Sequence, residues 1–320
     1  MGHVAWNNTS QTWKAQMIGK LLGDGCITKQ KGRKPRFQFI HTERDYMWSL
    51  YCYKSLKKDI PLNKPKYKKT IDSRLVKGYC ISYYVQSRTS DVISYLYRQW
   101  YPNGKKIIPF ILLNQYFNNE SLAWWYMDDG HLKVSKGIPQ KIILSTESFS
   151  DIEINKLIFF LKSKYNLTFS VDKQKRIILY DQYQIYYFLH LVSPFMHSSM
   201  SRKIIPLSTL NPIVPQTRTT IYLPVSQNIQ QPTKEINSAL EILDDMISNF
   251  KTGKFYEMYH LLISNISKNE KQRGYQIIIR EKRLTNLNFL KLNTGLTYSK
   301  LTYLCFKIRD YVYKNESVIL

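Results

Sequence analysis

Residues 122–130 read Leu-Ala-Trp-Trp-Tyr-Met-Asp-Asp-Gly, a run of large side chains that ends in two carboxylates and a glycine. A second stretch, residues 17–25, reads Met-Ile-Gly-Lys-Leu-Leu-Gly-Asp-Gly and ends in the same Asp-Gly pair. Both runs are typical of buried helices, and a carboxylate at a buried helix end needs a cation or a hydrogen-bond donor beside it. The two stretches are therefore candidates for the two halves of one site.

Two further landmarks follow each Asp-Gly pair in the same order and at similar spacing. They are a Thr-Glu pair after a strand-like run, at residues 42–43 and 146–147, and a Lys-Ile-Ile-Pro run, at residues 106–109 and 203–206. Such self-similarity indicates an internal duplication. The sequence therefore predicts a first half at residues 11–110 and a second half at residues 111–210.

Each half combines helical and strand-like patterns. Helical spacing of apolar residues occurs in residues 90–100, 151–164 and 182–192, whereas residues 36–41 and 79–86 alternate as strands do. The first strand should have two different faces, with Phe37, Phe39 and His41 on one and Arg36, Gln38 and Ile40 on the other. An α+β fold is expected, in which helices cover the apolar faces of two similar antiparallel sheets and a duplex groove can meet the polar faces.

Beyond the duplication, prolines interrupt the pattern. Residues 211–232 hold four prolines and little periodicity, and they are predicted to be a linker because proline fits neither a helix interior nor a central strand. Helical spacing then returns, so residues 233–320 are expected to form a small helical module that could make accessory contacts with DNA.

The charge of the chain points to a polyanionic partner. Lysine and arginine number 47 against 23 acidic residues, which gives a net charge of +24. Residues 216–320 carry 15 basic and 9 acidic residues, a net charge of only +6. Nucleic acid is therefore the first candidate partner, and its binding surface is expected in the first two-thirds of the chain.

The remaining composition narrows the class of protein. No apolar run is long enough to span a membrane, and the start of the chain lacks the apolar region of a signal peptide. The cysteines, Cys26, Cys52, Cys80 and Cys305, are scattered, which argues against a zinc site or a disulfide framework. Scattered cysteines of this kind are expected to be reduced thiols of an intracellular protein. Tyr, Ile, Asn and Lys are abundant, as AT-rich codons would produce, which favours an organelle or a phage or bacterial cytoplasm.

The two Asp-Gly helices can pack side by side. Gly19 and Gly23 lie four residues apart, a spacing that lets a partner backbone approach closely. This packing would bring the two helix ends together, and with them Asp24 and Asp129. Adjacent carboxylates repel each other until a divalent cation binds, and such oxygen ligands suit Mg²⁺. A site of this kind can activate water and neutralise the charge that develops in phosphodiester hydrolysis.

A third carboxylate and two lysines accompany this pair. The counterpart of Asp128 in the first stretch is Gly23, so its side chain is not expected to be a required ligand, although its backbone carbonyl could bind the metal. Lys106 and Lys203 stand at matching places in the two halves. Each could stabilise one scissile phosphate electrostatically.

The two helices resemble the paired motifs of the LAGLIDADG homing endonucleases, and the Met-Asp-Asp-Gly ending is similar to that of the monomeric, intron-encoded type. The resemblance covers residues 11–210. It implies a saddle of two antiparallel sheets, built from two αββαββα halves related by a pseudo-twofold axis. Such a saddle grips a long, poorly symmetric DNA site, and the enzyme cuts both strands to leave short 3′ overhangs. The chain departs from the family pattern at Lys20, where leucine is usual, and at Trp124, which replaces the first interface glycine. Residues 215–320 match nothing in it.

The resemblance also implies roles for individual residues. The last acidic residue of each motif, Asp24 or Asp129, is expected to bind the catalytic Mg²⁺, for which Mn²⁺ can substitute. Lys106, Lys203 and Gln38 are expected as further catalytic residues beside the metal. The implied partner is double-stranded DNA, bound by a monomer.

Charge and strand alternation supply candidates for DNA contacts in both halves. In the first half they are Lys31, Arg33, Lys34, Arg36, Gln38, Lys66, Lys68, Lys69, Arg74, Gln86 and Arg88. In the second half they are Lys133, Lys136, Lys141, Lys173, Lys175 and Arg176. Most residues of this kind contact phosphates rather than bases.

Two other functions are open on the same fold. An RNA maturase would bind its host intron RNA and assist the splicing of a group I intron, and the presence of both aspartates does not exclude this activity. A DNA-binding regulator without cleavage would be expected to lack one aspartate, and both are present. The favoured prediction is a Mg²⁺-dependent, site-specific DNA endonuclease.

Overall fold

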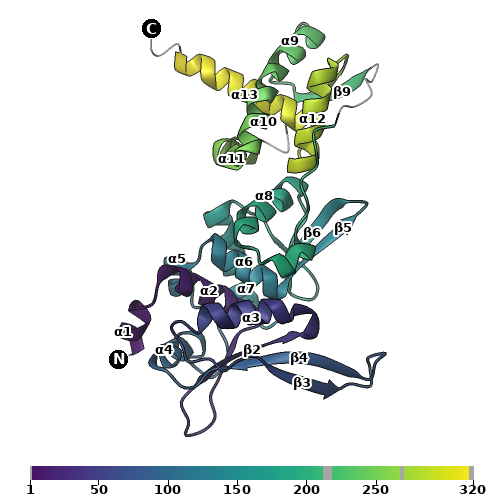
Figure 1. Cartoon of the computed structure of the whole chain (residues 1–320). Helices are drawn as coiled ribbons and strands as arrows, with labels where there is room; N and C mark the ends of the chain where they lie inside the picture. Colours follow the sequence, from purple (N-terminus) through teal and green to yellow (C-terminus); the bar gives the residue numbers. More distant parts are fainter. Residues whose placement is uncertain (1, 212–217, 267–269, 317–320) are drawn as a thin grey trace. The chain divides into compact units, whose positions relative to one another are not determined.

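The computed structural model describes residues 2–211, 218–266 and 270–316. The chain divides into two compact units (Figure 1). Unit 1 comprises Met1–Tyr180 and Phe188–Ile205, and unit 2 comprises Asp181–Tyr187 and Pro206–Leu320. Within the described ranges, neither unit contains a helix that is long and apolar enough to cross a bilayer.

Two copies of one order of elements make up most of unit 1. The first copy is α2 (Gln11–Leu22), β1 (Cys26–Thr28), β2 (Arg36–Thr42), α3 (Tyr46–Leu56), β3 (Lys66–Ile71), β4 (Tyr79–Gln86) and α4 (Asp91–Trp100). The second copy is α6 (Asn119–Asp129), β5 (Gly130–Ser135), β6 (Ile138–Leu144), α7 (Asp151–Tyr165), β7 (Ser170–Val171), β8 (Ile177–Leu179) and α8 (Gln182–Val192), of which the residues up to Tyr187 belong to unit 2. The remaining elements are α1 (Gly2–Asn7), α5 (Phe110–Tyr116) and the 3-10 turns η1 (Glu43–Asp45), η2 (Ser193–Phe195) and η3 (Ser198–Lys203). This order confirms the predicted αββαββα halves.

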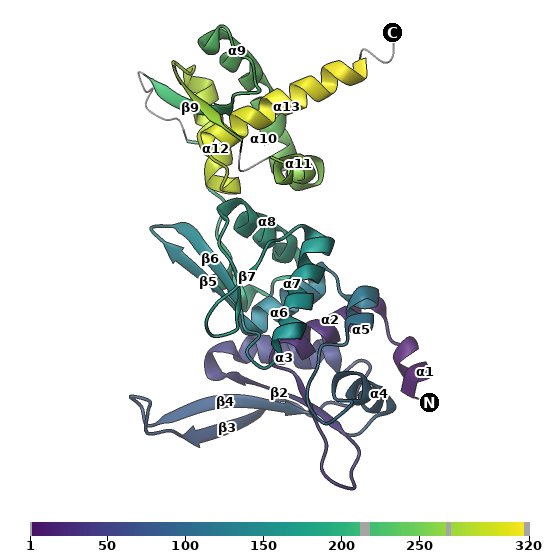
Figure 2. The same ribbon diagram turned by 180° about the vertical axis from the view of Figure 1, so that it is seen from behind.

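The two sheets of unit 1 share one strand order. It is β1-β2-β4-β3 in the first half and β5-β6-β8-β7 in the second. All neighbouring strands run antiparallel, as predicted. Figures 1 and 2 show both sheets extending to the same side of helices α2 and α6. The helix ends therefore lie at the base of two sheets that a single partner can contact.

Strand β2 has the two faces that its alternation predicts. The side chains of Phe37, Phe39 and His41 are buried, while those of Arg36 and Ile40 are exposed. Burial of large aromatic rings on one face contributes to the core of the first half. The opposite face is left free for a partner.

Local signals set the ends of the two central helices. Helix α2 begins after Ser10, whose side chain accepts a hydrogen bond from the N–H of Trp13 at 3.1 Å. Helix α6 begins after Asn118, which forms a capping box with Ser121. Gly130 follows the last residue of α6, and an added Cβ there would lie 2.0 Å from the Tyr126 ring.

Unit 2 has a hydrophobic core of its own. Strands β9 (Thr219–Pro224) and β10 (Gln272–Ile277) pair antiparallel. They pack with α9 (Pro232–Ala239), η4 (Leu240–Ile242), α10 (Leu243–Lys251), α11 (Phe255–Ser264), α12 (Glu281–Thr294) and α13 (Tyr298–Glu316). Fully buried side chains such as Leu240, Leu304 and Phe306 fill this core.

Strand β9 lies within the interval 211–232 that is predicted to be a linker. Residues 212–217 of that interval lie outside the described residues. The strand accommodates its proline because Pro224 is its last residue and the sheet has only two strands, so both strands are edges. Its partner β10 is distant in sequence, which is why the local pattern does not reveal the pairing.

Candidate active site at the paired helix ends

Helices α2 and α6 approach each other most closely at two glycines. A Cβ at Gly19 would lie 2.4 Å from the backbone oxygen of Ser121 and 2.7 Å from the Cβ of Trp124. A Cβ at Gly23 would lie 2.6 Å from the Cβ of Asp128. Only glycine permits this approach, as predicted. Trp124 does not prevent the close approach of the helices. Its Cβ lies against Gly19, and its ring is fully buried.

We expect Gly19→Ala to destabilise unit 1. The added methyl group would meet backbone rather than a movable side chain, and overpacking of this kind costs about 1–3 kcal/mol. Chemical denaturation of the purified protein measures the change. Thr12→Ala, on the exposed side of the same helix, is the control and should change the stability by less than about 0.5 kcal/mol. Equal stability of the two variants would contradict the close helix contact.

The Asp128 carboxylate is buried at this helix contact. Its Oδ1 accepts hydrogen bonds from Lys20 Nζ and Trp48 Nε1, both at 2.8 Å, and its Oδ2 accepts one from the backbone N–H of Asp24 at 3.1 Å. The side chains of Lys20 and Asp128 are both 0% exposed. Burial alone would raise the pKa of Asp128, but the Lys20 ammonium holds that pKa well below its usual range. The Lys20–Asp128 pair therefore remains charged inside the protein.

Asp24, His41 and Asp128 bring three possible metal-ligand atoms within 4.8 Å of one another. However, Lys20 Nζ already lies 2.7 Å from His41 Nε2 and 2.8 Å from Asp128 Oδ1. An ammonium group can only donate, so His41 Nε2 accepts this hydrogen bond. The positive charge of this cluster is thus supplied by Lys20, and a metal ion does not fit there.

Asp129 is the last residue of α6, and Asp24 follows the end of α2, close enough for the charges of the two side chains to interact. The Asp24 side chain is 34% exposed, so it is open to a ligand. Burial, together with the negative charges of Asp24 and Asp128, raises the pKa of Asp129 to about 8, and Lys106 offsets this only in part. The neighbouring charges disfavour the ionised form of Asp129, and a bound cation would stabilise that ionised form strongly. These hard oxygen donors fit a divalent cation such as Mg²⁺.

Lys203 is held at the C-terminal end of α6. Its Nζ donates to the carbonyls of Tyr126, Met127 and Asp128 at 3.0, 2.6 and 3.2 Å. An ammonium group has three N–H donors, so all of them are used. Burial lowers the pKa of Lys203 to about 8. The lysine caps the helix that carries Asp129. It also donates to the Asp128 carbonyl, which the sequence predicts as a further candidate metal ligand.

The other two predicted catalytic residues lie in the first half. Lys106 Nζ donates to the carbonyl of Gly25 at 3.0 Å, and burial lowers its pKa. Gln38 lies on the polar face of β2, where its Oε1 accepts hydrogen bonds from Tyr84 Oη at 2.8 Å and Gln86 Nε2 at 3.2 Å. These bonds fix the orientation of the Gln38 amide, and among the described residues its NH₂ group has no hydrogen-bond acceptor, so it can donate to a ligand.

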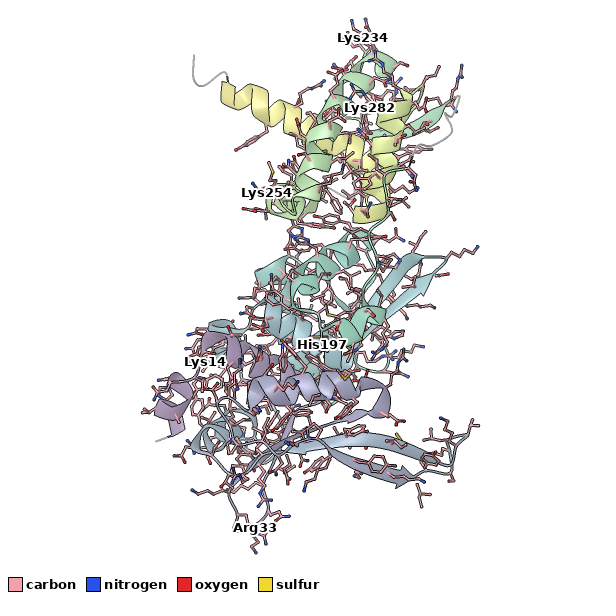
Figure 3. All side chains as sticks on the ribbon, in the orientation of Figure 1. Lys14, Arg33, His197, Lys234, Lys254 and Lys282 are labelled. Atoms are coloured by element: carbon pink, nitrogen blue, oxygen red, sulfur yellow. The ribbon has the colours of Figure 1, made fainter. Side chains whose placement is uncertain are left out.

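Most predicted DNA contacts fall on the polar strand faces or on the loops that join the strands. Strand register places Arg36, Gln38, Lys66, Lys68 and Gln86 on one face of the first sheet. Lys133 and Lys141 are paired in the second sheet. The other predicted contacts lie in or beside connecting loops, as Figure 3 shows for Arg33, and they include Lys31, Lys34, Arg88, Lys136 and Lys173.

A few predicted contacts are placed less favourably. Lys69 alternates with Lys68 and therefore lies on the opposite face of the sheet. Three others already have a carboxylate partner: Arg74 pairs with Asp72 at 2.8 Å, Lys175 with Asp151 at 2.9 Å and Arg176 with Asp172 at 2.6 Å. A phosphate would have to compete with these carboxylates.

Some residues of the site are not predicted from the sequence. The sequence identifies Lys20 only as a departure from the family pattern, and it assigns no role in the site to His41 or Trp48. The sequence did contain a signal for this ion pair. Lys20 in one helix and the extra acid Asp128 in the other carry opposite charges, and the two helices are expected to pack together. His131, on the exposed face of β5, is also missing from the predicted contacts.

A sequence model of the LAGLIDADG DNA endonuclease family matches residues 14–209, more than half of the chain. This range includes both helix ends and both four-stranded sheets. The probable intron-encoded endonuclease 1 of Wickerhamomyces canadensis is 27% identical over 207 residues, which are 62% of this chain and 87% of the relative. The cytochrome b mRNA maturase bI2 of Debaryomyces hansenii is 28% identical over 195 residues, 59% of this chain and 71% of the relative.

A solved structure shares the fold. The homing endonuclease I-WcaI bound to its DNA recognition sequence superposes with a TM-score of 0.54 and 24% sequence identity. The match covers 63% of this chain and 91% of that chain. It confirms the predicted saddle of two antiparallel sheets.

Proposed function

The chain belongs to the LAGLIDADG DNA endonuclease family, and we propose from this that it is a homing endonuclease that hydrolyses both strands of a long DNA site with a divalent metal. The observation that carries the proposal is the close approach of the two helix ends that bear Asp24 and Asp129: the backbone N–H of Asp24 lies 3.1 Å from Asp128 Oδ2, and the charge of Asp24 raises the pKa of Asp129. Each half supplies one aspartate, so one chain forms the complete site. We therefore propose that the protein acts as a monomer.

Asp24 and Asp129 are the proposed ligands of Mg²⁺, with Mn²⁺ able to substitute. The bound cation would lower the pKa of a water molecule and neutralise charge on the leaving oxygen. Lys106, whose ammonium is held against the Gly25 carbonyl, is the proposed cation beside the scissile phosphate. Gln38 is proposed to orient a phosphate or water through its free NH₂ group. Lys203 is proposed to act indirectly, by holding the end of α6 that carries Asp129.

The proposed partner is double-stranded DNA, contacted along the polar faces of both sheets. The large positive charge of the chain favours binding of the phosphate backbone. I-WcaI, which shares the fold, is bound to its DNA recognition sequence. Strand positions such as Arg36, Lys66 and Lys133 are the best placed for contacts with the duplex.

Cleavage of a selected DNA target tests this function. A library of long DNA sites is incubated with the purified protein and Mg²⁺, and cut molecules are recovered and sequenced. We expect one family of sites, cut in both strands with short 3′ overhangs, and no cutting in excess EDTA. Cleavage that persists in EDTA would contradict the metal site, and the absence of any preferred site would contradict site-specific cleavage.

A second candidate activity is RNA binding in intron splicing. One relative is named as a cytochrome b mRNA maturase, and another is named as intron-encoded. The proposed setting is a mobile intron, with the protein in an organelle or in a phage or bacterial cytoplasm. Filter binding that compares host intron RNA with target DNA distinguishes the two activities. Tighter binding of the folded intron than of unrelated RNA would support the maturase.

A further inference from the structure

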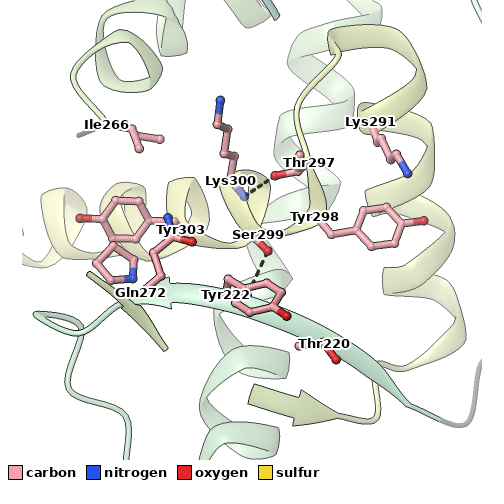
Figure 4. A pocket seen from close by; sticks show the side chains of 11 residues that line it. Thr220, Tyr222, Ile266, Gln272, Lys291, Thr297, Tyr298, Ser299, Lys300 and Tyr303 are labelled. Carbon is pink, nitrogen blue, oxygen red and sulfur yellow. Dashed lines mark hydrogen bonds between the residues drawn. The ribbon is translucent and has the colours of Figure 1, made fainter. Parts of the chain in front are cut away.

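A pocket of about 470 Å³ opens in unit 2 (Figure 4). Side chains from β9, from the last turn of α12 and from the first turns of α13 surround it. They include three tyrosines, Tyr222, Tyr298 and Tyr303, and two lysines, Lys291 and Lys300. Among the described residues that line the pocket, none is acidic. A pocket with aromatic rings, positive charge and no carboxylate suits an anionic ligand that also carries a flat ring.

Tyr222 presents a partly exposed ring to this pocket. Its residue partner across the β9–β10 pair is Gly274. A Cβ at Gly274 would lie 3.1 Å from the ring of Tyr222, so the ring lies over the glycine. Tyr222 nevertheless remains 52% exposed. One part of the ring is therefore supported by the strand pair and another part is free to stack.

A hydrogen bond joins the backbone of Tyr222, in β9, to the start of α13. Its backbone N–H donates to Ser299 Oγ at 3.0 Å, and the N–H of Lys300 donates to Thr297 Oγ1 at 3.2 Å (Figure 4). Lys291 Nζ lies 5.1 Å from the centre of the Tyr298 ring. Within the described part of the chain, neither Lys291 nor Lys300 forms a salt bridge, so both charges are available to a ligand.

We propose that this pocket binds an unpaired nucleotide of a nucleic-acid strand, with the base stacked on Tyr222 and the phosphate beside Lys300 or Lys291. Aromatic rings combined with basic side chains are the usual means of binding single strands, because every base has a π face. A duplex does not offer such a base, since its bases are already stacked and paired. The site lies wholly in unit 2 and outside residues 14–209, so it is an activity in addition to the proposed cleavage.

Fluorescence anisotropy of the full-length protein tests the proposal. The probes are a labelled DNA strand of about 12 nucleotides, the RNA strand of the same sequence and the corresponding DNA duplex. We expect Tyr222→Ala to weaken binding of a single strand by about tenfold, whereas Tyr222→Phe, which keeps the ring, should bind as the wild-type protein does. The strand that binds more tightly, DNA or RNA, identifies the source of the nucleotide.

A charge-matched pair of double variants separates the pocket from the overall charge of unit 2. Lys291→Glu with Lys300→Glu should weaken single-strand binding, while Lys234→Glu with Lys254→Glu, at exposed positions outside the pocket, should have a smaller effect. Equal losses in both double variants would overturn the proposal. So would wild-type binding by Tyr222→Ala, or an equal loss for Tyr222→Phe. Cleavage of the DNA target by the Tyr222 variants should be unchanged in rate, so failure here is distinguishable from failure of the proposed nuclease.

Discussion

An Asp129→Asn variant should lose DNA cleavage and, without metal, become more stable than the wild-type protein near pH 8. The loss of cleavage follows from the removal of a proposed metal ligand. Replacement of residues that merely support metal ligands already costs about 10–100-fold, so we expect a loss of more than about 100-fold for the ligand itself. Binding of target DNA should persist, because the polar sheet faces are unchanged.

The gain in stability follows from the pKa of Asp129. Burial and the neighbouring carboxylates raise this pKa from its ordinary value of 3.8 to about 8 in the folded protein. A group whose pKa is raised by folding stabilises the protein fully below its unfolded pKa, and this contribution is lost as pH rises through its folded pKa. The free energy of unfolding of the wild-type protein in EDTA should therefore fall between about pH 4 and pH 8. The variant lacks the titrating carboxyl group, so its stability should not show this decrease.

Thermal unfolding in EDTA and in Mg²⁺, at about pH 5 and pH 8, measures these effects. We expect the variant to exceed the wild-type protein by at least about 1 kcal/mol near pH 8 in EDTA, since one unit of pKa corresponds to about 1.4 kcal/mol. Mg²⁺ should stabilise the wild-type protein more than the variant. Asp151→Asn, a carboxylate whose side chain is 72% exposed, is the control and should change neither cleavage nor the response to Mg²⁺. Undiminished cleavage by Asp129→Asn would exclude it as a catalytic ligand.

The duplicated pattern of the sequence predicts most of unit 1. Alternation in β2 correctly buries Phe37 and Phe39, because a strand with one apolar face has only one way to lie on a core. The spacing of Gly19 and Gly23 correctly predicts close helix packing, since a missing Cβ is visible in the sequence itself. These features depend on local periodicity, which a single chain displays directly.

Features that depend on contacts between distant residues are not visible in this way. Lys203 matches Lys106 in sequence, yet it caps α6 with three hydrogen bonds while Lys106 reaches Gly25. The reason is that the direction of a long, flexible side chain depends on which unpaired carbonyls lie near it in the fold. The pairing of β9 with β10 is hidden in the same way, because α9, η4, α10 and α11 lie between the two strands in the sequence.

A Lys20→Met variant should unfold far more easily than the wild-type protein, and a second change, Asp128→Asn, should restore much of the loss. Removal of one partner from a buried ion pair leaves an uncompensated charge, which costs about 3–5 kcal/mol. Asp128 would keep its bonds to Trp48 and to the N–H of Asp24, but these neutral donors do not balance its charge. Neutralising both partners removes this cost, so the double variant should exceed Lys20→Met by about 2 kcal/mol.

Lys14 supplies a matched control for this pair. It lies in the same helix and is only 3% exposed, and its Nζ donates to the carbonyl of Asn7 rather than to a carboxylate. Lys14→Met should therefore cost less than Lys20→Met, and Asp128→Asn should not rescue it. Asp128 also holds the backbone N–H of Asp24, so cleavage by Lys20→Met should fall at temperatures where the variant is still folded. If Asp128→Asn rescued both lysine variants equally, the effect would be general, and the buried pair would not be the element that joins the two halves beside the proposed metal site.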